Sequence, residues 1–350
     1  MRHQDVFVLI ACFFATYGMV ASVLQSCLVG SCRHGNDYKM VSLYPPGTAP
    51  QALPMPQQTR IFHEYGGRLG NILFQYAAIT SLAKQHNGTA CFDHNALDGL
   101  FEDQSDSCTS LAPAWAAVVS ENRNYGMHVN FTIRGDTVLH GYLQSYKYFA
   151  PEVLQSLRIQ TRFKSHARMI LSHTLALPIA RPRAAIHIRN LHSHGETDLI
   201  HLLPRHSYLR FPLPFYFEYA MAYLREQHPA VTFVVLSDDP AWCRKQAFLQ
   251  HADVKIVPPD TAPIVDLALI AECEHVILTR GTFGWWGAFL GASARGGLVL
   301  YNAAEFDMQD PVNADHVVLA DFYPAHWIRI GIGSQLKPPH VYAPNTYAQI

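Results

Sequence analysis

The chain has 350 residues, of which 49% are hydrophobic and 15% are charged, and its formal net charge at pH 7 is −1. This length is enough for one large domain or two moderate ones, each with a sizeable core. A net charge so close to zero excludes the strongly basic composition of nucleic-acid-binding proteins, so no nucleic-acid partner is expected. The 20 histidines occur without the His-Glu-x-x-His or Cys-x-x-Cys spacing of metal ligands, and no metal site is predicted.

An apolar segment near the N-terminus predicts a membrane anchor. No charged residue occurs between Val6 and Cys32, and the run from Val6 to Leu24 is close to the roughly 20 residues that a spanning helix needs. A signal peptide is the alternative, but its apolar core covers only about 7–15 residues. We therefore expect a cytoplasmic tail at residues 1–5 and an uncleaved transmembrane helix at residues 6–28.

The residues after this segment favour a lumenal position for the rest of the chain. Prolines recur between residues 45 and 56, which excludes a regular helix and predicts an extended stem over residues 29–60. Asn87 and Asn130 each begin an Asn-x-Thr glycosylation signal, which is used in secreted and lumenal proteins. A short tail, one anchor, a stem and a lumenal domain make up a single-pass type II membrane protein.

Five cysteines lie outside the apolar segment, and their number suits an oxidising compartment. Cys91 and Cys108 could close one loop, and Cys243 and Cys273 could close another. Spacing alone does not assign these pairs.

The globular part is expected to begin near Arg60. The run GGRLGN at residues 66–71 precedes an apolar stretch that predicts a helix over residues 72–84, with Asn71 as its N-cap and Gly88 as its stop. The other elements expected before residue 180 are a strand at 137–143, a turn or helix start at 144–149 and helical structure at 151–177.

From residue 183 onward, β-branched runs alternate with helical stretches. Strands are expected at residues 184–189, 231–236, 253–257, 275–279 and 297–301. Helices are expected at residues 213–227, 240–250, 264–273 and 282–292. This alternation predicts a parallel sheet covered by helices, as in nucleotide-binding domains.

The run GTFGWWGA at residues 281–288 marks a strand-to-helix junction. In an open α/β sheet, ligands bind at such junctions. We expect Thr282 to be the helix N-cap, beside free N–H groups that favour an anion such as a phosphate. The alternative is that Phe283, Trp285 and Trp286 only pack a core.

Two further runs carry groups suited to a nucleoside diphosphate. In the glycine run at 66–71, Arg68 could pair with a phosphate through two hydrogen bonds, although an ordinary loop is the alternative. Arg189 ends a predicted strand, where it could stabilise a departing diphosphate or form a structural salt bridge.

Asp238 and Asp239 end the next predicted strand. Acidic residues in this place often hold a ribose or a base edge. They could equally cap the helix that begins at Pro240, and both roles are compatible. No Asp-x-Asp pair, which commonly holds a divalent ion against a sugar-nucleotide diphosphate, occurs in the chain, so positive side chains and helix ends would have to neutralise the charge.

Taken together, these residues resemble the α-1,2-fucosyltransferase family, glycosyltransferase family 11, from about Ile61 to Ile330. The matching pieces are residues 67–77, 141–149, 187–189, 236–243, 266–270, 281–289, 322–324 and 327–328. Their order and combination carry the resemblance.

The resemblance implies inverting transfer of L-fucose from GDP-β-L-fucose to the 2-hydroxyl of a galactose, with no metal or other cofactor. It implies a GT-B-like α/β fold, with an acceptor part at residues 61–180, a Rossmann-like donor part at 181–335 and a tail at 336–350. The implied partners are GDP-fucose, a galactose-terminated glycan on a glycoprotein or glycolipid, and the Golgi membrane through the N-terminal helix.

The roles expected from the motifs and the resemblance divide into two groups. The expected catalytic residues are Arg189, His187 and Glu64, with Glu64 as general base and His187 and Asp198 as its alternatives. The expected donor-binding residues are Arg68, Gly70, Asn71, Asn190, Asp238, Asp239, Thr282, Phe283 and Gly284. An acceptor sugar could stack on Tyr142, Tyr146 or Trp115, although these side chains could also belong to the core.

One segment departs from the family pattern His-x-Arg-Arg-x-Asp. The first arginine is Arg189, but Asn190 replaces the second and His192 replaces the aspartate. A charge-assisted hydrogen bond of this kind contributes about 1.5–3 kcal/mol. The loss leaves two alternatives open, a catalytically silent sugar-binding homologue and a glycosyltransferase with a different donor or acceptor.

Overall fold

The computed structural model describes residues 59–102, 107–121, 126–178, 180–189, 214–259, 261–279, 281–302 and 317–331. All of them belong to Val41–Ile350, one of the two units into which the chain divides. The predicted tail, anchor and nearly all of the stem lie outside the described residues, as does the expected tail at 336–350. Within the described ranges, no helix has both the length and the apolar composition needed to cross a bilayer.

The first sheet has five parallel strands in the order β3-β2-β1-β5-β4. The strands are β1 (Arg60–His63), β2 (Thr89–Phe92), β3 (Ser107–Thr109), β4 (Ala117–Ser120) and β5 (Thr137–His140). Helix α3 (Leu69–Gln85) connects β1 to β2 and packs on this sheet. The helices that follow β5 are η1 (Tyr146–Tyr148), α4 (Pro151–Ser156), α5 (Thr161–Met169) and η2 (Ile170–Thr174).

The second sheet has six parallel strands in the order β11-β10-β9-β6-β7-β8. They are β6 (Arg183–Ile188), β7 (Thr232–Ser237), β8 (Val254–Ile256), β9 (His275–Leu278), β10 (Val299–Asn302) and β11 (Ile328–Ile330). Numbered along the chain, this is the 3-2-1-4-5-6 order of doubly wound nucleotide-binding sheets, so the Rossmann-like topology is confirmed.

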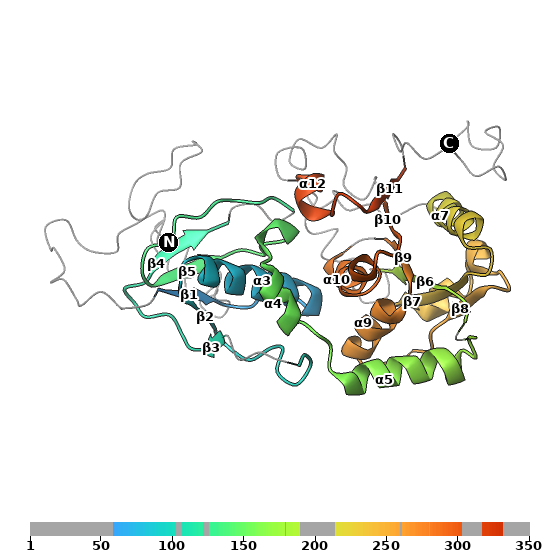
Figure 1. Ribbon diagram of the computed structural model, residues 1–350, viewed down its shortest axis with the longest axis horizontal. Helices are drawn as coiled ribbons and strands as arrows, with labels where there is room; N and C mark the ends of the chain where they lie inside the picture. The colour runs from blue at the N-terminus through green and yellow to red at the C-terminus, as the bar shows by residue number, and fades with distance from the viewer. Residues whose placement is uncertain are drawn as a thin grey trace, which may run out of the picture. The chain divides into compact units, whose positions relative to one another are not determined.

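Helices cover both faces of the second sheet (Figure 1). The described helices of this half are α7 (Pro214–Gln227), α8 (Pro240–Cys243), η4 (Ala247–Leu249), α9 (Pro263–Glu272), α10 (Thr282–Leu290), η5 (Ser293–Arg295) and α12 (Leu319–Phe322). Helix α7 packs with Ile186 and Val235 on one face, whereas α9 and α10 pack with Ala185 and Val234 on the other. Burial on both faces explains why these strands are continuous apolar runs in the sequence.

Two predicted helical stretches are interrupted. The stretch at 240–250 divides into α8 and η4, because Gln246 between them has an extended backbone. The stretch at 151–177 divides after α4, where Ile159 forms an antiparallel bridge with Phe101. In the second case a long-range contact overrides the local helical pattern.

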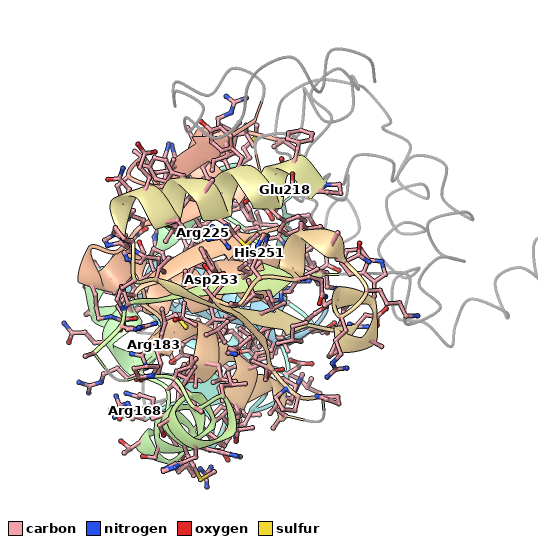
Figure 2. The ribbon with its side chains drawn as sticks, turned by 90° about the vertical axis from the view of Figure 1, so that its right-hand side faces the viewer. Arg168, Arg183, Glu218, Arg225, His251 and Asp253 are labelled. Atoms are coloured by element: carbon pink, nitrogen blue, oxygen red, sulfur yellow. A yellow bond between two sulfur atoms is a disulfide. The ribbon has the colours of Figure 1, made fainter. Side chains whose placement is uncertain are left out.

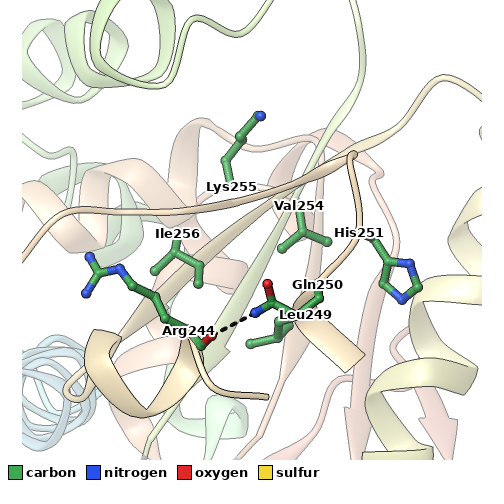
Figure 3. A pocket seen from close by; sticks show the side chains of 7 residues that line it. All are labelled: Arg244, Leu249, Gln250, His251, Val254, Lys255 and Ile256. Atoms are coloured by element: carbon green, nitrogen blue, oxygen red, sulfur yellow. Dashed lines mark hydrogen bonds between the residues drawn. The ribbon is translucent and has the colours of Figure 1, made fainter. Parts of the chain in front are cut away.

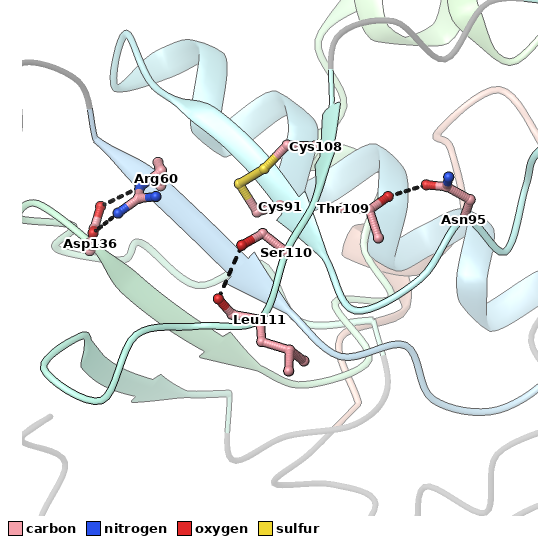
Figure 4. Close-up of a disulfide and its surroundings, with 8 residues drawn as sticks. All are labelled: Arg60, Cys91, Asn95, Cys108, Thr109, Ser110, Leu111 and Asp136. Carbon is pink, nitrogen blue, oxygen red and sulfur yellow. Dashed lines mark hydrogen bonds and ion pairs between the residues drawn. A yellow bond between two sulfur atoms is a disulfide. The ribbon is translucent and has the colours of Figure 1, made fainter.

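One of the two possible disulfides is present. Cys91 and Cys108 are bonded, with a Cα–Cα distance of 4.5 Å, and join β2 to β3 beside the Arg60–Asp136 ion pair (Figure 4). Closing a loop of this size contributes about 3 kcal/mol in the chain-entropy description. The other possible pair is wrong, because Cys243 and Cys273 are both free and buried.

Ion pairs join the outer helices to neighbouring elements, and Figure 2 labels Arg225 and Asp253 of one pair and Arg168 of the other. Arg225 of α7 lies 2.7 Å from Asp253, just before β8, and Arg168 of α5 lies 2.7 Å from Glu272 at the end of α9. Because the Arg168 side chain is 61% exposed, such a pair contributes at most about 1 kcal/mol. The apolar core therefore carries most of the stability.

An aromatic cluster forms the centre of the larger core. The rings of Phe74 in α3 and Trp285 in α10 are 4.6 Å apart, and Trp285 and Trp286 are both fully buried. The Trp285 indole N–H donates to the carbonyl oxygen of Phe322 in α12, at 2.9 Å. The core alternative for these two tryptophans is therefore correct.

Within the part of the chain that the structure describes, Trp285 makes a hydrogen bond through its indole N–H and Trp286 does not, so substituting the two residues should lower the stability of the protein by different amounts. Trp286 Nε1 has no hydrogen-bond partner among the described residues, so Trp286→Phe removes volume only, whereas Trp285→Phe also removes the bond to α12. We expect Trp285→Phe to lower the free energy of unfolding by about 1–2 kcal/mol more than Trp286→Phe. Urea unfolding of the two variants measures this, and equal losses would contradict it.

Candidate functional site

Three strand ends of the second sheet meet at its carboxyl edge. The Thr279 hydroxyl, after β9, donates to the carbonyl oxygen of His187 in β6 at 2.9 Å and accepts from the Arg189 backbone N–H at 3.2 Å. The Arg189 guanidinium lies 3.4 Å from the Asp238 carboxylate, after β7. The structure thus brings together Arg189 and Asp238, and the salt bridge that was one interpretation of Arg189 is present.

The neighbouring Asp239 has the capping role expected of it. Its side chain accepts a hydrogen bond from the backbone N–H of Trp242, at 2.9 Å, in the first turn of α8. Its own backbone N–H is bonded to the Ser237 hydroxyl at 3.0 Å. The turn that carries both aspartates is therefore held at the sheet edge.

Helix α10 begins at this same edge, and its N-cap lies one residue earlier in the chain than expected. Gly281, at φ 88°, is the N-cap, and Thr282 is the first helical residue, so the assignment of Thr282 as the cap is wrong. Gly281 is suited to this position because its left-handed backbone would strain any other residue. Among the described residues no side-chain cap bond is made at this helix start, and the first N–H groups of a helix carry a partial positive charge that attracts an anion.

His187 packs beneath the first turn of α10. Its ring lies 5.5 Å from that of Phe283, and a Cβ atom on Gly284 would lie 2.4 Å from His187 Nδ1. Burial, and secondarily the charge of Arg189, lowers the pKa of His187 to about 3, so the ring is neutral near pH 7. No described residue hydrogen-bonds to Nδ1, and the imidazole is only 7% exposed.

The glycine run of the first sheet meets this helix start. A Cβ atom on Gly70 would lie 2.6 Å from Thr282 and Phe283. The Thr282 hydroxyl donates to Asn71 Oδ1 at 2.8 Å. Helix α3 begins at Leu69 with Arg68 as its N-cap, so the assignment of Asn71 as the cap is wrong. The Asn71 side chain bonds to Thr282 and does not cap α3.

The loop before α3 is held by a buried glutamine that sequence reasoning missed. The Gln75 side chain accepts from the Gly66 backbone N–H at 3.0 Å and donates to the Gly66 carbonyl at 3.1 Å. Glu64 and Arg68, on either side of Gly66, are exposed at the carboxyl edge of the first sheet. The sequence did contain a signal for Gln75, because it is a polar residue on the apolar face of the predicted helix.

Gln144 and Glu121 also escaped the sequence reasoning. Gln144 Nε2 donates to Asn71 Oδ1 at 3.0 Å, and the Glu121 carboxylate accepts from the Leu143 backbone N–H at 2.8 Å. Burial raises the pKa of Glu121 to about 8. Gln144 lies within the matching piece at residues 141–149, which is the one signal that pointed to it.

The remaining predicted residues are glycosylation candidates, aromatic rings on which a sugar could stack, and residues that lie outside the described ranges. Asn190, His192 and Asp198 lie outside the described residues. The glycosylation candidates Asn87 and Asn130 are both exposed, and Asn87 occupies a turn at φ 51°. Trp115 is 55% exposed, so it does not belong to the core, whereas Tyr142 and Tyr146 are half-buried.

A ligand could also bind at a metal site or in a pocket away from the sheet edge. No group of three or more His, Cys, Asp or Glu side chains that could hold a metal ion occurs among the described residues. An open pocket lies beside edge strand β8 (Figure 3), and none of the predicted site residues lines it. Its lining residues are Arg244, Leu249, Gln250, His251, Val254, Lys255 and Ile256.

Comparison with known proteins identifies related sequences. The family model described as Glycosyl transferase family 11 matches residues 214–327. Galactoside alpha-(1,2)-fucosyltransferase 2 from Bos taurus is 30% identical over 288 residues, which cover 78% of this chain and 78% of that protein. Galactoside 2-alpha-L-fucosyltransferase SEC1 from Bos taurus is 30% identical over 253 residues, which cover 68% of this chain and 65% of that protein. The chain thus spans slightly less than two thirds of the SEC1 protein.

The solved structures that this chain matches are more remote. NodZ alpha-1,6-fucosyltransferase soaked with GDP-fucose has a TM-score of 0.44 and 14% identity, covering 67% of this chain and 93% of that chain. POFUT1 in complex with GDP has a TM-score of 0.46 and 13% identity, covering 70% of this chain and 98% of that chain.

The close packing of Gly284 against His187 predicts a compensating pair of substitutions. Gly284→Ala places a methyl group against the imidazole, and we expect it to lower the free energy of unfolding by about 1–3 kcal/mol. His187→Ala removes the obstructing ring, so the double variant should lose less than the sum of the two single variants. Thermal unfolding of the three variants measures this, and strict additivity would contradict the contact.

Proposed function

The chain is a glycosyltransferase that belongs to family 11, and on that premise we propose that it transfers L-fucose from GDP-β-L-fucose to the 2-hydroxyl group of a terminal galactose. The relatives that support the family are named as galactoside fucosyltransferases. One observation carries the proposal: Arg189 and the start of α10 lie at the same carboxyl edge of a doubly wound sheet. This is the edge at which such sheets bind nucleotides.

The donor site that we propose uses the groups at this edge. The diphosphate lies against the first N–H groups of α10 and the guanidinium of Arg189, which together offset its negative charge. Asp238 and Asp239 hold the ribose or guanine side. The chain contains no Asp-x-Asp pair, and we propose that these positive groups replace a divalent ion, with no cofactor required.

The reaction is a single displacement that inverts the configuration at the anomeric carbon. The galactose 2-hydroxyl oxygen forms a bond to that carbon as the bond to GDP breaks. Glu64, exposed at the carboxyl edge of the first sheet, accepts the hydroxyl proton. Full turnover of Glu64→Gln would exclude this residue as the base.

The cellular setting is a Golgi membrane, with the chain anchored through residues 6–28 and its catalytic part in the lumen. The galactose-terminated acceptor belongs to a glycoprotein or a glycolipid. The exposure of Asn87 and Asn130 supports their use as glycosylation sites, which a mobility shift on treatment with peptide N-glycosidase would reveal.

An activity assay tests the proposed function. The full chain in detergent is incubated with GDP-fucose, EDTA and a panel of β-galactosides, and GDP release is followed together with product mass. We expect a product heavier by one fucose unit that an α-1,2-specific fucosidase degrades. GDP binding without any product would favour a silent homologue, which the altered segment at 190–192 motivates. Product from another nucleotide sugar alone would favour a different donor.

Arg189 and Arg183 form a matched pair for testing the donor site, because they flank the same strand at opposite ends. Arg183 pairs with Glu274 at 2.8 Å, at the amino edge. We expect Arg189→Ala to weaken GDP binding by about 10- to 100-fold, as loss of a charged hydrogen bond predicts. Arg183→Ala should leave GDP affinity unchanged. Titration calorimetry distinguishes the two, and equal affinities for Arg189→Ala and the unmodified chain would remove Arg189 from the site.

A further inference from the structure

A single side-chain oxygen joins the first turns of two helices and a loop that are far apart in the sequence. Asn71 Oδ1 accepts one hydrogen bond from Gln144 Nε2 at 3.0 Å and another from the Thr282 hydroxyl at 2.8 Å. The three residues follow β1, β5 and β9 respectively, so they come from the carboxyl edges of both sheets. We call this set of three residues the polar bridge.

Gln144 is held firmly on its own side of the polar bridge. The preceding residue, Leu143, has a left-handed backbone at φ 52°, and its N–H donates to the buried carboxylate of Glu121 at 2.8 Å. On the other side, the Ser145 hydroxyl donates to the carbonyl oxygen of Asp321 at 2.8 Å. Gln144 itself is only 5% exposed, so its amide has little freedom to leave Asn71.

The polar bridge also determines which groups remain for a ligand at the start of α10. The hydroxyl hydrogen of Thr282 is donated to Asn71, so Thr282 does not offer this hydrogen to an anion. The backbone N–H groups of the first turn are left for that purpose. Their position depends on the contact with α3, where Gly70 allows Thr282 to approach closely.

We propose that Gln144 is a positioning residue for the transfer reaction, which acts through Asn71 to hold the first turn of α10 in place beside the first sheet. The proposal rests on the proposed function, because that turn is where the donor diphosphate is taken to bind. Gln144 acts on α10 only through the shared oxygen of Asn71. Removing Asn71 should therefore abolish the effect of changing Gln144.

Hydrogen exchange in the absence of ligand tests the structural part of the proposal. The readout is the exchange rate of a peptide covering α10, in the unmodified full chain and in Gln144→Met, Asn71→Ala and the double variant. Methionine keeps the length of glutamine but donates no hydrogen bond. We expect each single variant to exchange about threefold to tenfold faster, and the double variant to exchange no faster than Asn71→Ala alone.

Tyr146→Phe is the matched control, because it removes the bond from the Tyr146 hydroxyl to the Ala320 carbonyl, two residues along the chain from Gln144, and leaves the polar bridge intact. It should not change exchange in α10. Unchanged exchange in Gln144→Met, or additive effects in the double variant, would overturn the proposal. Thermal unfolding of each variant identifies a general loss of fold, which would accelerate exchange in every peptide and not in α10 alone.

Kinetics test the functional part. In Gln144→Met we expect kcat/KM for the donor to fall about tenfold, with no further fall when Asn71→Ala is added. Faster exchange in α10 with unchanged kcat/KM would overturn the positioning role. An unmodified chain that is inactive with every donor and acceptor would contradict the proposed function instead, and the exchange experiment would still decide whether the polar bridge holds α10.

Discussion

The contact between the starts of two helices is the constraint on which the site depends. Helix α3 follows the first strand of one sheet and α10 follows the fourth strand of the other, and Gly70 lets the two backbones touch at Thr282. A side chain at residue 70 would have to displace main-chain atoms, which rigid helices do not accommodate. The bond from Thr282 to Asn71 depends on that close approach.

The surrounding packing supports this edge of the second sheet, where the polar side chains are partly buried. Beneath the first turn of α10 lies the neutral ring of His187, and behind its later turns lies the aromatic cluster around Trp285. Arg189 is drawn toward Asp238 at the same edge. In the proposed site the two tasks are separate, because buried apolar groups hold the backbone whereas the charged side chains are the ones proposed to contact the substrate.

The sequence predicted the second sheet far better than the first. The strands at β6, β7 and β9 are buried on both faces, so each is a continuous apolar run that stands out between helices. The strands of the first sheet have only three or four residues, and in β4 exposed and half-buried residues alternate. Such short segments resemble loops, and β1 to β4 were not predicted. The assignments of Asn71 and Thr282 as N-caps were wrong because the two side chains bond to each other across 211 residues of sequence and not to the backbone of their own helices.

The sequence by itself determined the family, the parallel order of alternating strands and helices in the second half, and the residue types at the strand ends, because these depend on local pattern and motif. Only the tertiary structure decided which of these residues meet. It paired Cys91 with Cys108, joined Arg189 to Asp238, and linked Gln144 to Thr282 through Asn71. These contacts join segments separated by 17 to 211 residues, and their formation depends on how two sheets and their helices pack, which no local pattern in the chain encodes.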